Sequence, residues 1–201
     1  MTDIQEDDVV WAALHRVYAL MDTSIYNTLD KQHEFKKQTI LADESLTKDE
    51  KSEVIKFLNE DYDYYKILFN EGTKRTCENC QDECFATLYC EHCVRNYLKE
   101  NFSNWTSGNI DIDNLIQKCQ METFAPHKIV EWIPYNNLQN VEYFTKGGCS
   151  EIYTATWIGG GYYEWDSKEK QLTRYGDQYV ILKELENVKS ANRNWFEEVC
   201  N

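Results

Sequence analysis

Residues 144–157, FTKGGCSEIYTATW, are followed after an insertion by residues 178–187, QYVILKELEN. Both segments show β-strand patterns, and the adjacent Gly147 and Gly148 predict a tight turn. We therefore expect two strands joined by this turn and a third strand that carries Lys183. A glycine turn lets backbone N–H groups approach phosphate oxygens, and a lysine on the next strand neutralises their charge. This order of elements suits phosphate binding.

The turn resembles the Gly-rich loop of protein kinases. The family's G-x-G-x-x-G-x-V motif falls on Thr145, Gly147, Ser150 and Ile152, and only its middle glycine is matched. Thr145 and Ser150 carry Cβ atoms where the family has glycine, so the loop departs from the motif on both sides. The resemblance implies the amino-terminal lobe of a kinase, with this loop over the phosphates of a nucleotide.

The third strand resembles the V-A-I-K strand of the same family, with its lysine at Lys183. In the family this lysine holds the α and β phosphates of ATP, and a glutamate on helix C pairs with it. Glu198, fifteen residues after Lys183, stands at the position of that glutamate. The resemblance thus implies an ATP site with Mg²⁺ as its metal. Its residues would be Gly147, Gly148, Ile152, Lys183 and Glu198.

The later kinase signatures, H-R-D, D-F-G and A-P-E, do not occur in the 201 residues. In the family these segments bind Mg²⁺ and accept the proton of the substrate hydroxyl. We therefore expect a truncated, pseudokinase-like lobe of three antiparallel strands and the start of helix C. A complete relative would phosphorylate Ser, Thr or Tyr in proteins, whereas this chain alone is not expected to transfer phosphate.

Two C-x-x-C pairs lie in the segment CENCQDECFATLYCEHC at residues 77–93. Four thiolates suit the tetrahedral coordination of zinc, and a closed four-ligand site is structural rather than catalytic. Cys84 and His92 also lie in this segment. We interpret Cys84 as a bystander because the pairs already supply four ligands, and we expect His92 at the surface because a histidine between two ligands would strain a single tetrahedral site. The predicted zinc ligands are Cys77, Cys80, Cys90 and Cys93.

The chain as a whole resembles a lineage-expanded group of fungal proteins with a tyrosine-kinase-like domain. In that group a cysteine-paired segment, an N-W-T-S-G-N-x-x-I-D stretch and an E-W-I-P-Y lead-in precede the kinase-like domain. The corresponding residues here are 77–93, 104–113 and 131–135. We expect an α+β fold in three parts. They are an acidic helical hairpin at 1–72, a cysteine-rich zinc knuckle with short helices at 73–126, and a partial kinase lobe at 127–201.

The amino-terminal part shows helical periodicity. Residues 8–42 contain neither glycine nor proline, and the apolar pattern loosens after Met21, which leaves open a break near residues 22–24. Thr47 and Glu50 form a capping box that starts another helix, and we expect Gly72 to end it. Two such helices pack most simply as an antiparallel hairpin that serves as a spacer or docking arm. A dimerising coiled coil is the alternative, but too few heptads repeat.

The charge balance disfavours some classes of partner. The chain has 21 basic and 35 acidic residues and a net charge of -14, so we expect neither nucleic acid nor an anionic membrane as a partner. The amino terminus, MTDIQEDDVV, lacks the pattern of a secretory signal, and the run VVWAAL is too short to span a bilayer. We therefore expect a cytoplasmic protein. Its eight cysteines should be reduced, metal-bound or buried rather than paired as disulfides.

Two functions of different classes are compatible with these patterns. The first is a truncated kinase-like protein that binds ATP by resemblance to its family. The second is a non-enzymatic, zinc-stabilised module in which the acidic helices and the zinc knuckle recruit a protein partner. An apolar sheet face left uncovered by the absent carboxyl lobe would favour the second function.

Overall fold

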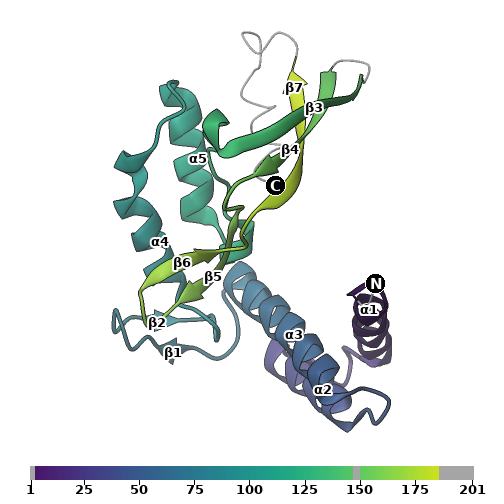
Figure 1. The fold of residues 1–201 in the computed structure, drawn as a ribbon. Coiled ribbons are helices and arrows are strands. Elements are labelled where there is room, and N and C mark those ends of the chain that lie inside the picture. Colours follow the sequence, from purple (N-terminus) through teal and green to yellow (C-terminus); the bar gives the residue numbers. More distant parts are fainter. Residues whose placement is uncertain (1–2, 147–149, 186–201) are drawn as a thin grey trace. The chain divides into compact units, whose positions relative to one another are not determined.

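A computed structural model describes residues 3–146 and 150–185 of the chain (Figure 1). The chain divides into two compact units, Met1–His92 and Cys93–Asn201. The helices are α1 (Asp3–Leu20), α2 (Leu29–Ala42), α3 (Lys48–Phe69), α4 (Glu91–Glu100) and α5 (Ile110–Glu122). The strands are β1 (Arg75–Thr76), β2 (Glu83–Cys84), β3 (Leu138–Lys146), β4 (Ser150–Trp157), β5 (Tyr162–Asp166), β6 (Gln171–Arg174) and β7 (Gln178–Leu185). Helices and small antiparallel sheets confirm the α+β class.

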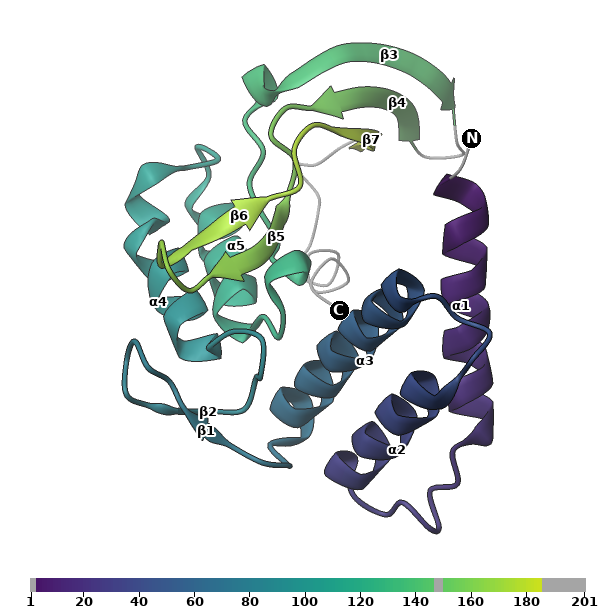
Figure 2. The ribbon, with the colours of Figure 1, turned by 60° about the horizontal axis from the view of Figure 1, so that its bottom comes forward.

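The amino-terminal part is built from three helices rather than two, because the break left open near residues 22–24 is present and divides the first predicted helix (Figure 2). The break after α1 has a local cause, because the carboxylate of Asp22 accepts hydrogen bonds from the backbone N–H and the hydroxyl of Ser24. Thr28 then caps α2 by accepting from the N–H of Lys31. The three helices share one buried cluster. It consists of Val10, Ala13, Leu14, Val17, Ile40, Leu46, Val54 and Leu58.

The third helix begins as the sequence predicts and ends slightly earlier. Thr47 and Glu50 form both hydrogen bonds of the capping box. The helix ends at Phe69, and Asn70 follows with a φ of 51° in the left-handed region. Asn70 therefore takes the C-cap position expected of Gly72, since asparagine tolerates this conformation better than most residues.

The predicted strands form a three-stranded antiparallel sheet in the order β3–β4–β7 (Figure 1). The three strands expected between residues 141 and 183 are thus present. The insertion after Trp157 forms its own hairpin of β5 and β6. The expected helix C falls within residues 186–201, which lie outside the described residues.

One cysteine departs from the redox expectation. Cys119, on α5, is buried as expected, but it is disulfide-bonded. The expectation that no cysteine forms a disulfide is therefore wrong for Cys119. Whether two cysteines approach within bonding distance depends on the tertiary fold, and spacing along the sequence does not show it.

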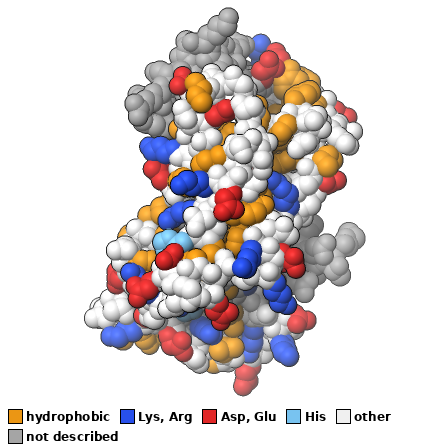
Figure 3. All heavy atoms as spheres, turned by 90° about the vertical axis from the view of Figure 1, so that its left-hand side faces the viewer, with side chains coloured by type: hydrophobic (Ala, Val, Ile, Leu, Met, Phe, Trp, Pro, Cys, Tyr) orange, Lys and Arg blue, Asp and Glu red, His pale blue; other side chains and the backbone are white. Residues whose placement is uncertain are grey.

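The surface carries charge of both signs. Acidic and basic side chains are interspersed over the face drawn in Figure 3, and neither sign forms a continuous block there. None of the helices within residues 3–146 and 150–185 is long and apolar enough to cross a membrane.

Candidate metal centre

The first C-x-x-C pair lies in a tight turn between β1 and β2. The backbone N–H of Cys77 donates to the carbonyl of Asp82, and the N–H of Gln81 donates back to the carbonyl of Cys77, both at 2.9 Å. Gln81 has a φ of 65°, which lets the chain reverse within four residues. The turn brings Cys77 and Cys80 to the same side of the hairpin.

The second C-x-x-C pair lies at the start of a helix. Cys90 immediately precedes α4, and Cys93 lies in its first turn. A helix start leaves backbone N–H groups without intrahelical acceptors, and its dipole favours negative charge nearby. Thiolates in this place are therefore stabilised by the helix itself.

The four predicted zinc ligands come together. The Sγ atoms of Cys77, Cys80, Cys90 and Cys93 all lie within 4.8 Å of one another. The Sγ atoms of Cys80 and Cys90 are 3.7 Å apart. An ideal tetrahedron with zinc–sulfur bonds of about 2.3 Å has sulfur–sulfur edges of about 3.8 Å. These four cysteines could therefore bind a metal ion such as zinc.

The electrostatics of the cluster favour a thiolate at Cys77. Burial acts to raise the pKa of the Cys77 thiol, but the backbone N–H groups of Cys80 and Asn79 and the thiols of Cys90 and Cys80 outweigh it. The pKa of Cys77 is consequently lowered to about 6. A metal ion binds thiolates rather than thiols, so the lowered pKa of Cys77 favours the binding of a cation at neutral pH.

A second group, made of Cys84, Cys90 and Glu91, also has its ligand atoms within 4.8 Å of one another. Its carboxylate is already engaged, because the two oxygens of Glu91 accept hydrogen bonds from the backbone N–H groups of Phe85 and Ala86. Burial raises the pKa of the Cys84 thiol and so disfavours a thiolate there. This group fits a cation less well than the four cysteines.

The loop between the two cysteine pairs is held on two sides. The carboxylate of Asp63, on α3, accepts hydrogen bonds from Thr87 and Leu88. The guanidinium of Arg75 donates to the carbonyl oxygens of Ala86 and Tyr89. Sequence analysis missed both contacts. On the helical repeat Asp63 falls on the side of α3 opposite Val54, so the apolar pattern of this helix gave no signal for the contact.

The predicted nucleotide residues are only partly described. Ile152 on β4 and Lys183 on β7 are directly opposite each other in the antiparallel pairing. The side chain of Lys183 is exposed. Gly147, Gly148 and Glu198 lie outside the described residues, so the expected pairing of Lys183 with Glu198 lies outside them as well.

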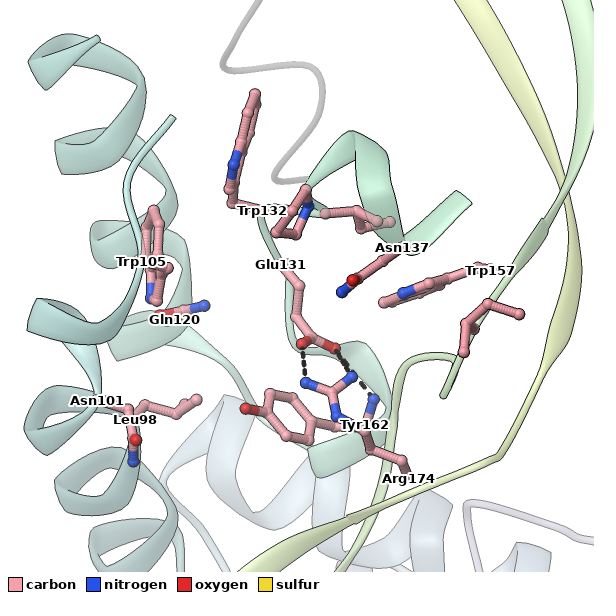
Figure 4. A pocket seen from close by; sticks show the side chains of 13 residues that line it. Leu98, Asn101, Trp105, Gln120, Glu131, Trp132, Asn137, Trp157, Tyr162 and Arg174 are labelled. Carbon is pink, nitrogen blue, oxygen red and sulfur yellow. Dashed lines mark hydrogen bonds and ion pairs between the residues drawn. The ribbon is translucent and has the colours of Figure 1, made fainter. Parts of the chain in front are cut away.

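The second unit contains a pocket that sequence analysis did not predict (Figure 4). At its base the carboxylate of Glu131 and the guanidinium of Arg174 form an ion pair at 2.6 Å. The signal available in the sequence was the density of tryptophan in the stretches at residues 104–113 and 131–135 and at the end of β4.

The chain was compared with protein families, curated proteins and solved structures. No protein-family model, no curated protein and no solved structure matches this chain.

Proposed function

We propose that this chain is a non-enzymatic protein-interaction module stabilised by a structural zinc ion. The observation that carries the proposal is a pair of exposed apolar side chains on β7. Tyr179 is 75% exposed and Ile181 is 68% exposed. Burying such side chains against a partner stabilises the complex by about 25 cal/mol for each Å² of apolar surface removed from water.

The geometry of the sheet makes these side chains available together. Tyr179 and Ile181 are two residues apart in a strand and therefore project from the same face. Within the described strands β7 lies at the edge of its sheet, with only β4 paired to it. Such an edge offers backbone N–H and C=O groups to a further strand. An extended apolar segment of a partner protein would satisfy both features.

The matched pair Ile181→Ser and Ile110→Ser tests this surface. Ile110 is 69% exposed, so the two substitutions change the same residue type at equal exposure in different places. Proteins captured on the immobilised wild-type chain would be compared with those captured on each variant, after circular dichroism shows that both are folded. We expect Ile181→Ser to lose a partner that Ile110→Ser retains. Equal capture by both variants would count against the module.

We further propose that zinc occupies the four-cysteine cluster. The closeness of the thiols supports this, and four protein ligands leave no open coordination position for chemistry, so the role would be structural. Metal analysis of the purified protein should give about one equivalent of zinc, lost in Cys77→Ser and retained in Cys84→Ser. Less than about half an equivalent in the wild type would refute the site.

The second candidate function is ATP binding by a partial kinase lobe, with Mg²⁺. It is favoured by the position of Lys183 on β7, directly opposite Ile152 on β4. Titration with ATP and Mg²⁺ should then saturate, and Lys183→Ala should abolish binding while Lys168→Ala, at another exposed lysine, should not. A folded chain that binds no ATP would exclude this function without affecting the first. No phosphoryl transfer is expected in either case.

A further inference from the structure

The second unit contains a pocket of about 220 Å³ (Figure 4). Its volume lies below the range of about 300–1,000 Å³ that is usual for drug-sized ligands, so it suits a single small ring. The residues that line it are Leu98, Asn101, Trp105, Gln120, Glu131, Trp132, Ile133, Pro134, Asn137, Trp157, Ile158, Tyr162 and Arg174.

Two tryptophan-bearing stretches of the sequence meet at this pocket. Trp105 lies in a loop that Asp113 holds by accepting hydrogen bonds from the hydroxyl of Thr106 at 2.5 Å and from the N–H of Ser107 at 2.7 Å. Trp132 lies in a segment without regular secondary structure, which Gln120 holds by donating from its Nε2 to the carbonyl of Val130 at 2.8 Å. Both indoles are therefore held by backbone that is itself fixed.

The charges at the base of the pocket compensate each other. The carboxylate of Glu131 binds the guanidinium of Arg174 and also accepts from the N–H of Tyr162 at 3.1 Å. The guanidinium lies over the ring of Tyr162, with 4.2 Å between its central carbon and the ring centroid. Since both charges are already paired, the pocket offers no free charge to an ionic ligand and suits a neutral one.

A buried hydrogen-bond acceptor in the pocket wall lacks a donor. Gln120 is only 3% exposed, and its Nε2 donates to the carbonyl of Val130 at 2.8 Å. That carbonyl can only accept, so the orientation of the amide is fixed. The Oε1 atom is buried and has no hydrogen-bond partner. Because this oxygen is shielded from solvent, a ligand hydroxyl would supply the missing donor once the side chains that cover it shift.

The pocket also offers hydrogen-bond donors between apolar faces. Within the described residues, none of the indole N–H groups of Trp105, Trp132 and Trp157 donates a hydrogen bond. The amide of Asn137 points toward the centre of the pocket (Figure 4). In that view Trp105 and Trp132 stand upright while Trp157 lies across, so the aromatic faces have different orientations.

We propose that this pocket binds one neutral sugar ring, either a monosaccharide or the end of a glycan. A pyranose has apolar C–H faces that pack on aromatic rings and hydroxyl groups that both donate and accept. It would therefore satisfy Gln120, Asn137 and the indole N–H groups at once. A charged ligand would meet a neutralised ion pair. This proposal is independent of the partner surface on β7.

Saturation-transfer NMR with the full chain tests the proposal, using a panel of methyl glycosides of glucose, galactose, mannose and N-acetylglucosamine. We expect saturable binding of at least one glycoside. Trp132→Ala should raise its Kd about tenfold or more, because the ligand loses an aromatic face. Trp11→Ala is the matched control, since Trp11 lies on α1 outside the pocket and should leave Kd unchanged.

Three results would overturn the proposal. The first is a folded wild-type chain that binds no glycoside of the panel. The second is binding that Trp132→Ala leaves unchanged, which would place the sugar elsewhere. The third is preferential binding of a flat ligand such as adenosine or indole, included in the same panel, with displacement by that ligand of any bound glycoside.

Discussion

The carboxylate of Asp63, on α3, binds both the backbone and the side chain of Thr87. The N–H of Thr87 donates to the two carboxylate oxygens at 2.7 and 2.8 Å, and its hydroxyl donates at 2.8 Å. The N–H of Leu88 adds a further bond at 2.9 Å. Asp63 is completely buried, at 0% exposure, so its charge is tolerated only because donors surround it. The contact fixes the loop that leads into the second cysteine pair.

Asp63→Ala should therefore strongly destabilise the unit Met1–His92. The substitution leaves the donors of Thr87 and Leu88 unpaired in a buried place, and we expect a loss of about 3 kcal/mol in the free energy of unfolding. Urea denaturation followed by circular dichroism measures it. Glu53→Ala, at an exposed position on the same helix, should change stability by less than about 0.5 kcal/mol. A loss below about 1 kcal/mol for Asp63→Ala would contradict the role of this contact.

Gly160→Ala should destabilise the second unit for a steric reason. Gly160 has a φ of +58°, and a Cβ atom there would lie 2.1 Å from the carbonyl oxygen of Gly176. Gly108 is the matched control, since its φ of +82° is also positive but a Cβ atom would meet nothing within 4 Å. We expect about 1 kcal/mol for Gly108→Ala from backbone strain alone, and at least twice that for Gly160→Ala. Thermal unfolding of both variants makes the comparison, and equal losses would be inconsistent with the clash.

Arg174→Ala should lower the stability of the fold, because it leaves the buried carboxylate of Glu131 without its cation. Burial raises the pKa of Glu131, and the guanidinium of Arg174 acts against that rise by pairing with the ionised form. Without Arg174 we expect a loss of about 3 kcal/mol in unfolding free energy at neutral pH. The exposed pair of Lys118 and Glu122 is the control, and Glu122→Gln should cost at most about 0.5 kcal/mol.

The pH dependence of the stability lost in Arg174→Ala gives a second test of the ion pair. A buried carboxyl group without its cation binds a proton more tightly in the folded state, so acidification should restore part of the lost stability. Denaturation at several pH values between about 4 and 7 would show it. A loss that does not shrink on acidification would mean that the arginine acts through packing and not through its charge.

Asp43 should make stability fall at low pH. Its carboxylate accepts hydrogen bonds from the side chain and backbone of Ser45 and from Arg16, and these lower its pKa from 3.8 to about 2. Because the folded-state pKa lies below the unfolded one, the stabilisation is fully present above the unfolded value and disappears as pH falls through the folded value. The difference in unfolding free energy between wild type and Asp43→Asn should therefore shrink as pH falls from 3.8 toward 2. A difference that is constant over this range would refute the assignment.

Several local features could be predicted from the sequence. The capping box of Thr47 and Glu50 depends on residues three apart, and the strand pattern of β4 and β7 depends on the residues within each strand. The cysteine spacing indicated the metal cluster for a similar reason, since each C-x-x-C turn places two sulfurs on one side. The break after α1 was left open near residues 22–24, and the side-chain hydrogen bonds of Asp22 and Thr28 end one helix there and begin the next.

The capped helix start at Thr47, the strands and the paired thiols follow from residues that are close together in the chain. Other contacts join residues that are far apart in the chain and depend on the folded structure: Asp63 with Thr87, Glu131 with Arg174, and the three tryptophans around one pocket. The two groups differ in the distance along the chain over which their interactions act. Secondary-structure propensities, helix caps and C-x-x-C turns involve residues a few positions apart. Buried ion pairs and binding pockets bring together distant segments, and the distance between two segments along the chain does not predict their distance in space.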